Sequence, residues 1–337
     1  MSPRRRPVSP AAKAGFVLPS VLFVVAMVTL VFLVAVQSLN SLAEETRRAT
    51  SRVRFESSAL SLEAQATFLA ATRPLGPTAI LQGWSPSAAP ALMLDGRPYA
   101  AAPDLTLSAQ DEAGLINLDT LTQPAMANLF AALGASPQQR AIMVDRLSDY
   151  MDAHDIKRPN GADADDYLRA GLPPPPDAPL RRKIQVLGVM GWREAVSAAA
   201  WRAFSDNVTA DPVNVDTNVN TAPAAALQVL YGVTPAQAKT AISRRQAWPF
   251  TTLEDLGRAA GVALVGDAER VYSFPNGHFA LKIDDRRSGW AYRSRLLLSP
   301  EDSVRPFWIV EPVASALSAA EKATVPTDVP PFPDPAA

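Results

Sequence analysis

The chain has 337 residues, a formal net charge of −1 and no cysteine. A chain of this length can bury one large core or two domains. The balanced charge and a calculated pI near 6.2 argue against a bulk nucleic-acid binder, which would carry an excess of basic residues. Without cysteine, structural disulfides and thiol chemistry are excluded, and a structural zinc site lacks its usual ligands.

The first feature along the chain is an uncharged apolar run, Phe16–Val36. At a rise of about 1.5 Å per residue, a helix over this run spans about 30 Å, the thickness of the hydrocarbon core of a bilayer. Basic residues precede the run, and the first acidic residue of the chain is Glu44. Positive charge on this flank predicts a cytoplasmic N-terminus, with the rest of the chain across the membrane.

Three interpretations fit this run. A cleaved signal peptide has a shorter apolar core and a small-residue cleavage site, and the residues after Val36 form a poor one. A plain signal anchor would keep the run as it stands. The third interpretation, which we favour, starts from Gly15-Phe16, where the basic leader meets the apolar run without a gap. This junction resembles the cleavage site of type IV prepilins and pseudopilins, which implies cleavage by prepilin peptidase and N-methylation of Phe16.

One position differs from most members of that family. Ser20 is the fifth residue after the predicted cut, where the family usually carries Glu. A carboxylate inside a bilayer costs about 2.5–3.5 kcal/mol unless it is paired, and the resemblance implies that a neighbouring subunit's N-terminal amine pairs with it. A subunit without this Glu cannot pair with a subunit ahead of it, which favours a place at the tip of a filament.

Helix and strand patterns follow the apolar run. Residues 37–72 predict a stem helix that Pro74 and Gly76 end. Its lower half needs a surface to pack against, and its apolar stripe at helical spacing is Leu42, Ala49, Val53, Leu60, Ala64 and Phe68. The strand candidates are Ala91–Leu94, Leu105–Ala109, Phe279–Ile283, Ala291–Leu298 and Pro306–Val310, with a turn at Gly96-Arg97-Pro98 between the first two. Paired antiparallel, such strands give a face that can cover the stem.

The stretch from about 117 to 265 predicts helices and is partly duplicated. The residues Leu129, Gly134, Pro137, Gln139 and Arg146 recur in the same order as Leu227, Gly232, Pro235, Gln237 and Arg244. Each copy predicts a helix, a short Gly-x-x-Pro turn and a second helix, with a Ser or Thr as the N-cap. The second copy resembles a helix-hairpin-helix module, which often binds DNA. It has a single hairpin Gly and few nearby bases (Lys239, Arg244 and Arg245), so we favour a packing unit over a DNA contact.

An acidic segment, Asp149–Tyr167, lies between the two copies. Its carboxylates repel one another unless a cation or solvent offsets their charge, and hard oxygen ligands at this density suit Ca²⁺. The candidate calcium ligands are Asp152, Asp155, Asp163, Asp165 and Asp166. The spacing is not that of an EF-hand loop, and a solvated acidic loop is the alternative.

Four motifs in a fixed order resemble the protein K family of type II secretion systems. They are Asp111–Leu118, Asp149–Asp152, Pro159–Asp163 and Val213–Pro223, and the hairpin module follows them. Members of this family are minor pseudopilins that also lack the stem Glu. The acidic segment departs from the family in carrying Tyr150 and His154 where Trp and further acids are common.

The resemblance implies an α+β fold, with a long N-terminal helix on a small antiparallel sheet and a large inserted all-α domain. The predicted organisation is a leader at 1–15, a transmembrane and stem helix at 16–72, the first part of the pilin-like domain at 73–110, an inserted helical domain at 111–270, C-terminal strands at 271–311 and a disordered tail at 312–337. It also implies a bacterial inner-membrane protein with a single span and a periplasmic bulk. The implied partners are minor pseudopilins I and J, prepilin peptidase and the inner-membrane assembly platform.

A non-enzymatic tip subunit of the secretion pseudopilus is therefore the predicted function. The two histidines, His154 and His278, lie in no recognised nucleophile or metalloprotease motif, so no enzyme activity is expected. A membrane-anchored DNA-binding protein of a competence-type uptake system is the alternative from another class. A minor pilin of a type IV pilus is a third possibility that differs mainly in the machine it serves.

Overall fold

The computed structural model describes residues 17–85, 88–153, 156–264, 271–323 and 328–335. The chain divides into two compact units, Met1–Ser57 and Ser58–Ala337. The predicted cleavage junction Gly15-Phe16 and the candidate calcium ligand Asp155 lie outside the described residues.

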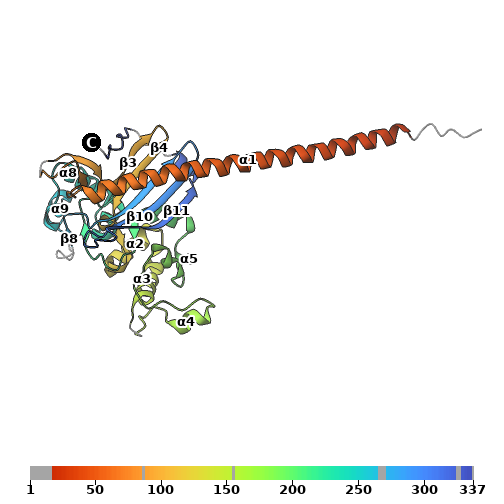
Figure 1. Cartoon of the computed structure of the whole chain (residues 1–337). Coiled ribbons are helices and arrows are strands. Elements are labelled where there is room, and N and C mark those ends of the chain that lie inside the picture. The colour runs from red at the N-terminus through yellow and green to blue at the C-terminus, as the bar shows by residue number, and fades with distance from the viewer. Residues whose placement is uncertain (1–16, 86–87, 154–155, 265–270, 324–327, 336–337) are drawn as a thin grey trace, which may run out of the picture. The chain divides into compact units, whose positions relative to one another are not determined.

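Helix α1 runs over Val17–Thr72 and begins the described chain (Figure 1). In the first unit its apolar side chains from Leu18 to Val34 are exposed, each at about half or more of its surface. Among the described residues it is the one helix long and apolar enough to cross a membrane, with a mean hydropathy of 2.7 in its most apolar window. Burying so large an apolar surface is favourable, and a bilayer is one environment that does so.

The second unit is built on a five-stranded antiparallel sheet in the order β11-β10-β9-β4-β3. Its strands are β3 (Asp95–Ala102), β4 (Leu105–Asp111), β9 (His278–Asp285), β10 (Trp290–Leu298) and β11 (Phe307–Ala316). A small hairpin, β1 (Ala79–Leu81) with β2 (Pro90–Met93), precedes it. Strands β4 and β9 are neighbours in the sheet although about half of the chain separates them, so the helical region is an insertion between two paired strands.

The inserted region consists of short helices and strand pairs. They are η1 (Glu112–Gly114), β5 (Ile116–Asn117), η2 (Leu118–Thr120), α2 (Gln123–Ala132), α3 (Pro137–Met151), α4 (Ala164–Arg169), η3 (Lys183–Gly188), α5 (Trp192–Ala195), α6 (Ala198–Phe204), η4 (Ser205–Asn207), β6 (Val208–Thr209), β7 (Thr217–Asn218), α7 (Ala224–Tyr231), α8 (Pro235–Ala247) and α9 (Leu253–Ala260). Strand β8 (Val271–Tyr272) pairs with β7, and α10 (Ala319–Ala323) follows the sheet. The predicted α+β class is thereby confirmed.

The predicted duplication is seen in the structure. Helices α2 and α3 form one copy and α7 and α8 the other, and Gly134 and Gly232 at the turns have φ of +88° and +67°, which favours glycine. Each second helix begins with a Pro and a capping box. The copies touch, since Asn128 Nδ2 donates to the carbonyl oxygen of Val229 at 3.0 Å. Their shared core includes Phe130, Trp192 and Trp201, whose rings meet edge to face.

The part of α1 in the second unit packs on one face of the sheet, but not by the stripe that the sequence indicates. Leu60 is 54% and Phe68 is 52% exposed, whereas Leu62 and Leu69 are buried. Tyr292 of β10 donates from its hydroxyl to Glu63 on the buried side of the helix, at 3.1 Å. Two faces of this helix have helical spacing, and the buried one carries small alanines that let the backbone approach the sheet closely; periodicity alone does not choose between them.

Two other expectations from the sequence are corrected. Gly96-Arg97-Pro98 is not a turn but lies inside β3, where the pairing with β4 shifts register between Asp95 and Pro98. A bulge accommodates Gly and Pro within a strand, so the same residues are compatible with a turn and with a bulged strand. The tail predicted to be disordered from residue 312 instead continues β11 to Ala316, and Phe332 N donates to the carbonyl oxygen of Ala100 at 2.8 Å.

Candidate functional site

The inserted region joins the sheet through buried and half-buried polar side chains, which we call the polar joint. Its members are Asp111, Glu112, Asn117, Thr209, Asp211, Asn218, Thr221, His278 and Arg295. Two of the motifs that carry the family resemblance, Asp111–Leu118 and Val213–Pro223, meet here. Gly114 of the first motif lies against the second so closely that a Cβ would stand 2.8 Å from the main-chain carbon of Thr221. Only glycine allows this approach.

Asp111 is the last residue of β4 and caps η1 by accepting a hydrogen bond from Ala113 N. Its side chain is 0% exposed. Asn218 Nδ2 donates to it at 2.9 Å and Thr221 Oγ1 at 2.8 Å, and both donors belong to the second motif. Burial raises the pKa of Asp111 to about 6, although these hydrogen bonds to the carboxylate oppose the increase.

Glu112, the next residue, is only 1% exposed and is paired with a cation. Arg295 of β10 donates from Nε to Oε1 of Glu112 at 2.6 Å and from Nη2 to Oε2 of Glu112 at 2.5 Å. Thr209 of β6 donates to Oε2 at 3.1 Å. This bidentate pair joins the first residues of the inserted region to β10 of the sheet.

Asp211 and His278 form the third pair of the joint, with Nδ1 and Oδ2 2.6 Å apart. Burial alone would raise the pKa of Asp211, but the hydrogen bond and charge of His278, with backbone N–H groups, hold that pKa below its ordinary value. Among the described residues, Glu112, Asp211 and His278 are the one group whose ligand atoms are close enough to hold a metal ion, within 4.8 Å of one another. Arg295 already occupies both oxygens of Glu112, so this group is a network of ion pairs rather than a vacant cation site.

The sequence indicates the two motifs of the joint but not three of the residues that hold them. Arg295 and His278 come from strands far along the chain. Arg245, predicted as one of the bases near the hairpin, is buried and donates to the carbonyl oxygens of Val219 and Ala222, each at 2.7 Å. Burial lowers its pKa to about 10. Because Arg245 stabilises the second motif, it is not available to bind a phosphate.

The acidic segment lies in the part of the insertion farthest from the sheet, at the end of α3 and in α4 (Figure 1). Its carboxylates have internal partners. Lys157 Nζ lies 3.1 Å from Asp163 and 2.9 Å from Asp166, and hydrogen bonds, led by that of Lys157, lower the pKa of Asp166 to about 2. Arg158 pairs with Asp149 at 2.6 Å and with Asp152 at 3.2 Å.

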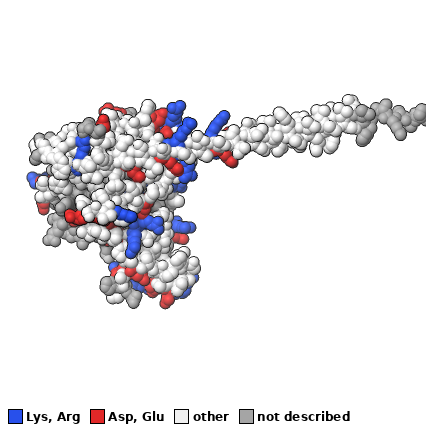
Figure 2. Space-filling view, viewed as in Figure 1, with Lys and Arg blue, Asp and Glu red and all other residues white. Residues whose placement is uncertain are grey.

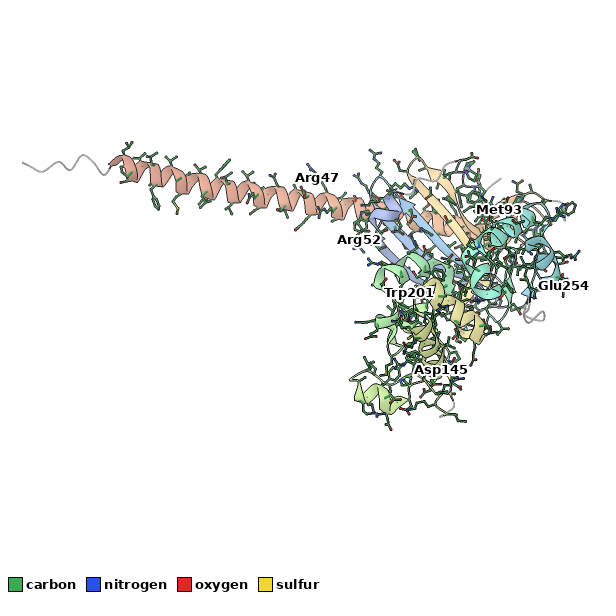
Figure 3. The ribbon with its side chains drawn as sticks, turned by 180° about the vertical axis from the view of Figure 1, so that it is seen from behind. Arg47, Arg52, Met93, Asp145, Trp201 and Glu254 are labelled. Atoms are coloured by element: carbon green, nitrogen blue, oxygen red, sulfur yellow. The ribbon has the colours of Figure 1, made fainter. Side chains whose placement is uncertain are left out.

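Two acids of the segment lie at the start of helix α4. Asp163 is the N-cap of α4 and Asp165 lies in its first turn. Asp145 of α3, labelled in Figure 3, accepts from Asn160 Nδ2 at 2.9 Å. Lys157 holds Asp163 and Asp166, Arg158 holds Asp152, and no three described carboxylates of the segment lie within metal-ligand distance of one another. A calcium ion would have to displace these cations and draw the carboxylates together.

Calcium binding at this segment stays a prediction. If the ion replaces the two cations, it should raise the melting temperature of the detergent-solubilised chain, because a ligand at a hundredfold excess over Kd adds about 2.7 kcal/mol. Melting curves with Ca²⁺ and with EDTA test this. Asp166→Asn should abolish the difference, and Asp302→Asn, an exposed acid outside the segment, should leave it intact. Identical midpoints for the unsubstituted chain would support the solvated loop.

The surface of the helical region shows no basic stripe on the face seen in Figure 2, where Lys and Arg alternate with Asp and Glu. Lys239 and Arg244 of α8 are exposed near the second hairpin, so two of the three bases predicted there are exposed and the third, Arg245, is buried. Binding of a nucleic-acid backbone depends on several such contacts, so the hairpin geometry favours packing.

Two consecutive parts of the chain match known protein families. Residues 105–212 match the family model described as type II secretion system (T2SS), protein K. Residues 213–263 match a helix-hairpin-helix motif. In fold, the chain is similar to a chain of the crystal structure of the GspK–GspI–GspJ complex from the enterotoxigenic Escherichia coli type 2 secretion system, with a TM-score of 0.54 and 14% identity, covering 81% of this chain and 99% of that chain. No curated protein matches by sequence.

Proposed function

We propose that this chain, whose residues 105–212 match the family model of type II secretion system protein K, is the minor pseudopilin at the tip of the secretion pseudopilus. In this role it initiates or caps the filament and carries out no reaction. Helix α1 holds it in the bacterial inner membrane, with the N-terminus cytoplasmic and the second unit in the periplasm.

The insertion between β4 and β9 is the observation that carries this proposal. A subunit inside a helical filament must offer matching surfaces to the subunits above and below it. The insertion, joined to the sheet by the bidentate pair of Glu112 and Arg295, adds a large body to the pilin-like sheet, and we infer that it obstructs one of these surfaces. Such a subunit is suited to the end of a filament, where one of the two surfaces is not needed.

The proposed partners are the minor pseudopilins I and J, the prepilin peptidase and the assembly platform. The exposed side chains Leu60 and Phe68 of α1 support contacts with other subunits, because large apolar residues on one helical face are typical of helix–helix interfaces. The same spacing continues toward the N-terminus at Leu42 and Val53, which are also exposed. The solved structure with a similar fold is a complex of the proteins GspK, GspI and GspJ.

Processing at the predicted junction is the first expected result. The mature protein should begin at Phe16 and carry a methyl group on its amine, because the basic leader and the apolar run meet there. Intact-mass measurement and N-terminal sequencing of membrane-extracted protein test this. A mature chain that keeps Met1, or that begins near residue 40, would contradict the prepilin interpretation.

The tip position is tested by Ser20→Glu. This substitution restores the usual carboxylate in α1, and it should bring little or no gain in incorporation, because the insertion still obstructs one filament surface. An unpaired carboxylate costs up to about 3 kcal/mol in the membrane. Secretion and filament assembly are measured in cells, with Thr29→Glu as a control acid elsewhere in the apolar run and a variant deleted for 117–265. Repeated incorporation of the Ser20→Glu chain along the filament would refute the tip position.

A further inference from the structure

The two edges of the five-stranded sheet differ in how they are covered. At the β3 edge, the chain's own C-terminal segment pairs with the strand: Ala100 N donates to the carbonyl oxygen of Pro330 and Phe332 N to that of Ala100, each at 2.8 Å. At the β11 edge, the strand pairs with β10 alone. Among the described residues, no main-chain group bonds to the outer side of β11. An open, apolar edge strand is a site for pairing with another strand.

The register of β11 shows which of its main-chain groups point outward. Ser299 N donates to the carbonyl oxygen of Pro306 at 2.7 Å, so Pro306 faces β10. Main-chain groups alternate along an antiparallel strand, so Trp308 and Val310 also face β10, and Phe307 and Ile309 present their N–H and C=O groups outward. The regular edge ends at Glu311, whose φ is +54°, and at Pro312.

The side chains along this edge are exposed on both faces of the sheet. Phe307 is 40% and Trp308 is 42% exposed, and neighbouring residues of a strand point to opposite faces. A charged residue flanks the apolar stretch on each side. Arg305 lies over the ring of Trp308, 4.8 Å from its centroid, and Glu311 follows Val310. Glu311 lines a cavity together with Lys183 and Arg295, and its charge favours the protonated form of both. A contact of Glu311 with Arg305 of another copy would therefore compete with these two bases.

We propose that β11 binds β11 of a second copy of the chain, antiparallel across a two-fold axis at Trp308. In this register Phe307 of each copy lies opposite Ile309 of the other, and their outward groups form four main-chain hydrogen bonds. No proline has to donate. Arg305 then lies opposite Glu311 of the other copy on both sides, so the sequence around Trp308 is complementary to itself, as a two-fold interface requires. The pairing describes the subunit outside a filament and does not depend on the tip position.

The test uses the full chain in membranes. The chain contains no cysteine of its own. Trp308→Cys places the two thiols at a directly opposite pair on the axis, where Cβ atoms lie about 4.5–5.5 Å apart, near the distance that a disulfide needs. Copper phenanthroline as oxidant should give a disulfide-linked dimer on a non-reducing gel. Val313→Cys is the matched control, because residue 313 is as exposed but lies far from its counterpart in this register.

The charges give a second arm. In the Trp308→Cys background, Arg305→Glu should remove most of the dimer, because it sets two acids opposite each other, and the exchange Arg305→Glu with Glu311→Arg should restore it. A dimer fraction equal to that of Val313→Cys would overturn the proposal, and so would a dimer that Arg305→Glu leaves unchanged. The dimer is scored as a fraction of the membrane-inserted chain, so a lower yield of the Trp308→Cys protein does not change the comparison between these variants.

Discussion

Replacing Arg295 by methionine should lower the free energy of unfolding by about 3–5 kcal/mol, the usual cost of leaving one member of a buried ion pair without its partner. Glu112 would keep one hydrogen bond, from Thr209 at 3.1 Å, and would lose both bonds to the guanidinium. Only 1% of its surface is exposed in the unsubstituted chain, so water replaces little of what is lost unless it enters the cavity that Glu112 and Arg295 line. We expect this to be the largest loss of stability from any single substitution in the polar joint.

Urea denaturation of the purified chain in detergent, followed by tryptophan fluorescence, measures this loss. Arg293→Met is the matched control on the same strand, because Arg293 pairs with Asp284 and Glu321, which are more exposed than Glu112, and should cost about 1 kcal/mol. Replacing Glu112 and Arg295 together by methionine should recover most of the loss, since two apolar groups need no partner. Equal losses for Arg293→Met and Arg295→Met would show that burial of the pair is not what matters.

Local signals predicted the helical elements well. Ser136 and Thr234 each precede a Pro and stand three residues before a Gln, and both form capping boxes in the structure. The strand candidates fall within β2, β4, β9, β10 and β11 or at their ends, because each is a short run bounded by turn signals, and all but Ala91–Leu94 contain β-branched or aromatic residues. The end of α1 at Thr72 follows from Pro74, which cannot continue a helix.

Features that depend on distant contacts were not predictable in this way. The pair of Glu112 and Arg295 joins residues far apart in the sequence, and nothing near either residue indicates its partner. The buried face of α1 depends on the shape of the sheet it meets, so the exposed stripe of Leu60 and Phe68 looked equally suitable. The C-terminal segment is poor in apolar residues, yet it is ordered at Phe332 by main-chain bonds to an open strand edge, which composition does not report.

The candidate site shows the same division. The motifs Asp111–Leu118 and Val213–Pro223 could be located from the sequence, but not the fact that they bind each other. The acidic segment was found from composition, and its pairing with Lys157 and Arg158 was not anticipated, although both bases lie within it. A charge count over a window of sequence adds up opposite charges but does not show which of them the fold brings into contact.

Asparagine at position 111 should change how stability depends on pH. Because burial raises the pKa of Asp111 from 3.8 to about 6, the folded chain binds a proton there that the unfolded chain releases between these values. Stability contributed by this group is therefore greatest below pH 3.8 and falls as the pH rises toward 6. At about 1.4 kcal/mol per pKa unit, the decrease amounts to about 3 kcal/mol. Asp119, with its pKa also raised to about 6 by burial, adds a decrease of the same sign.

The quantity to measure is the difference in unfolding free energy between Asp111→Asn and the unsubstituted chain, from urea curves at pH 4 and pH 7. It should rise by about 2 kcal/mol in favour of the variant over this pH range, because the amide has no charge to desolvate. Asp302→Asn is the control with the opposite sign, since backbone N–H groups lower the pKa of Asp302 and its removal should cost stability at pH 7. If the difference for Asp111→Asn stays constant, the buried carboxylate is ionised throughout. An ionised carboxylate there would need a positive charge beside it, whereas the groups that act on Asp111 in the folded chain are neutral hydrogen-bond donors.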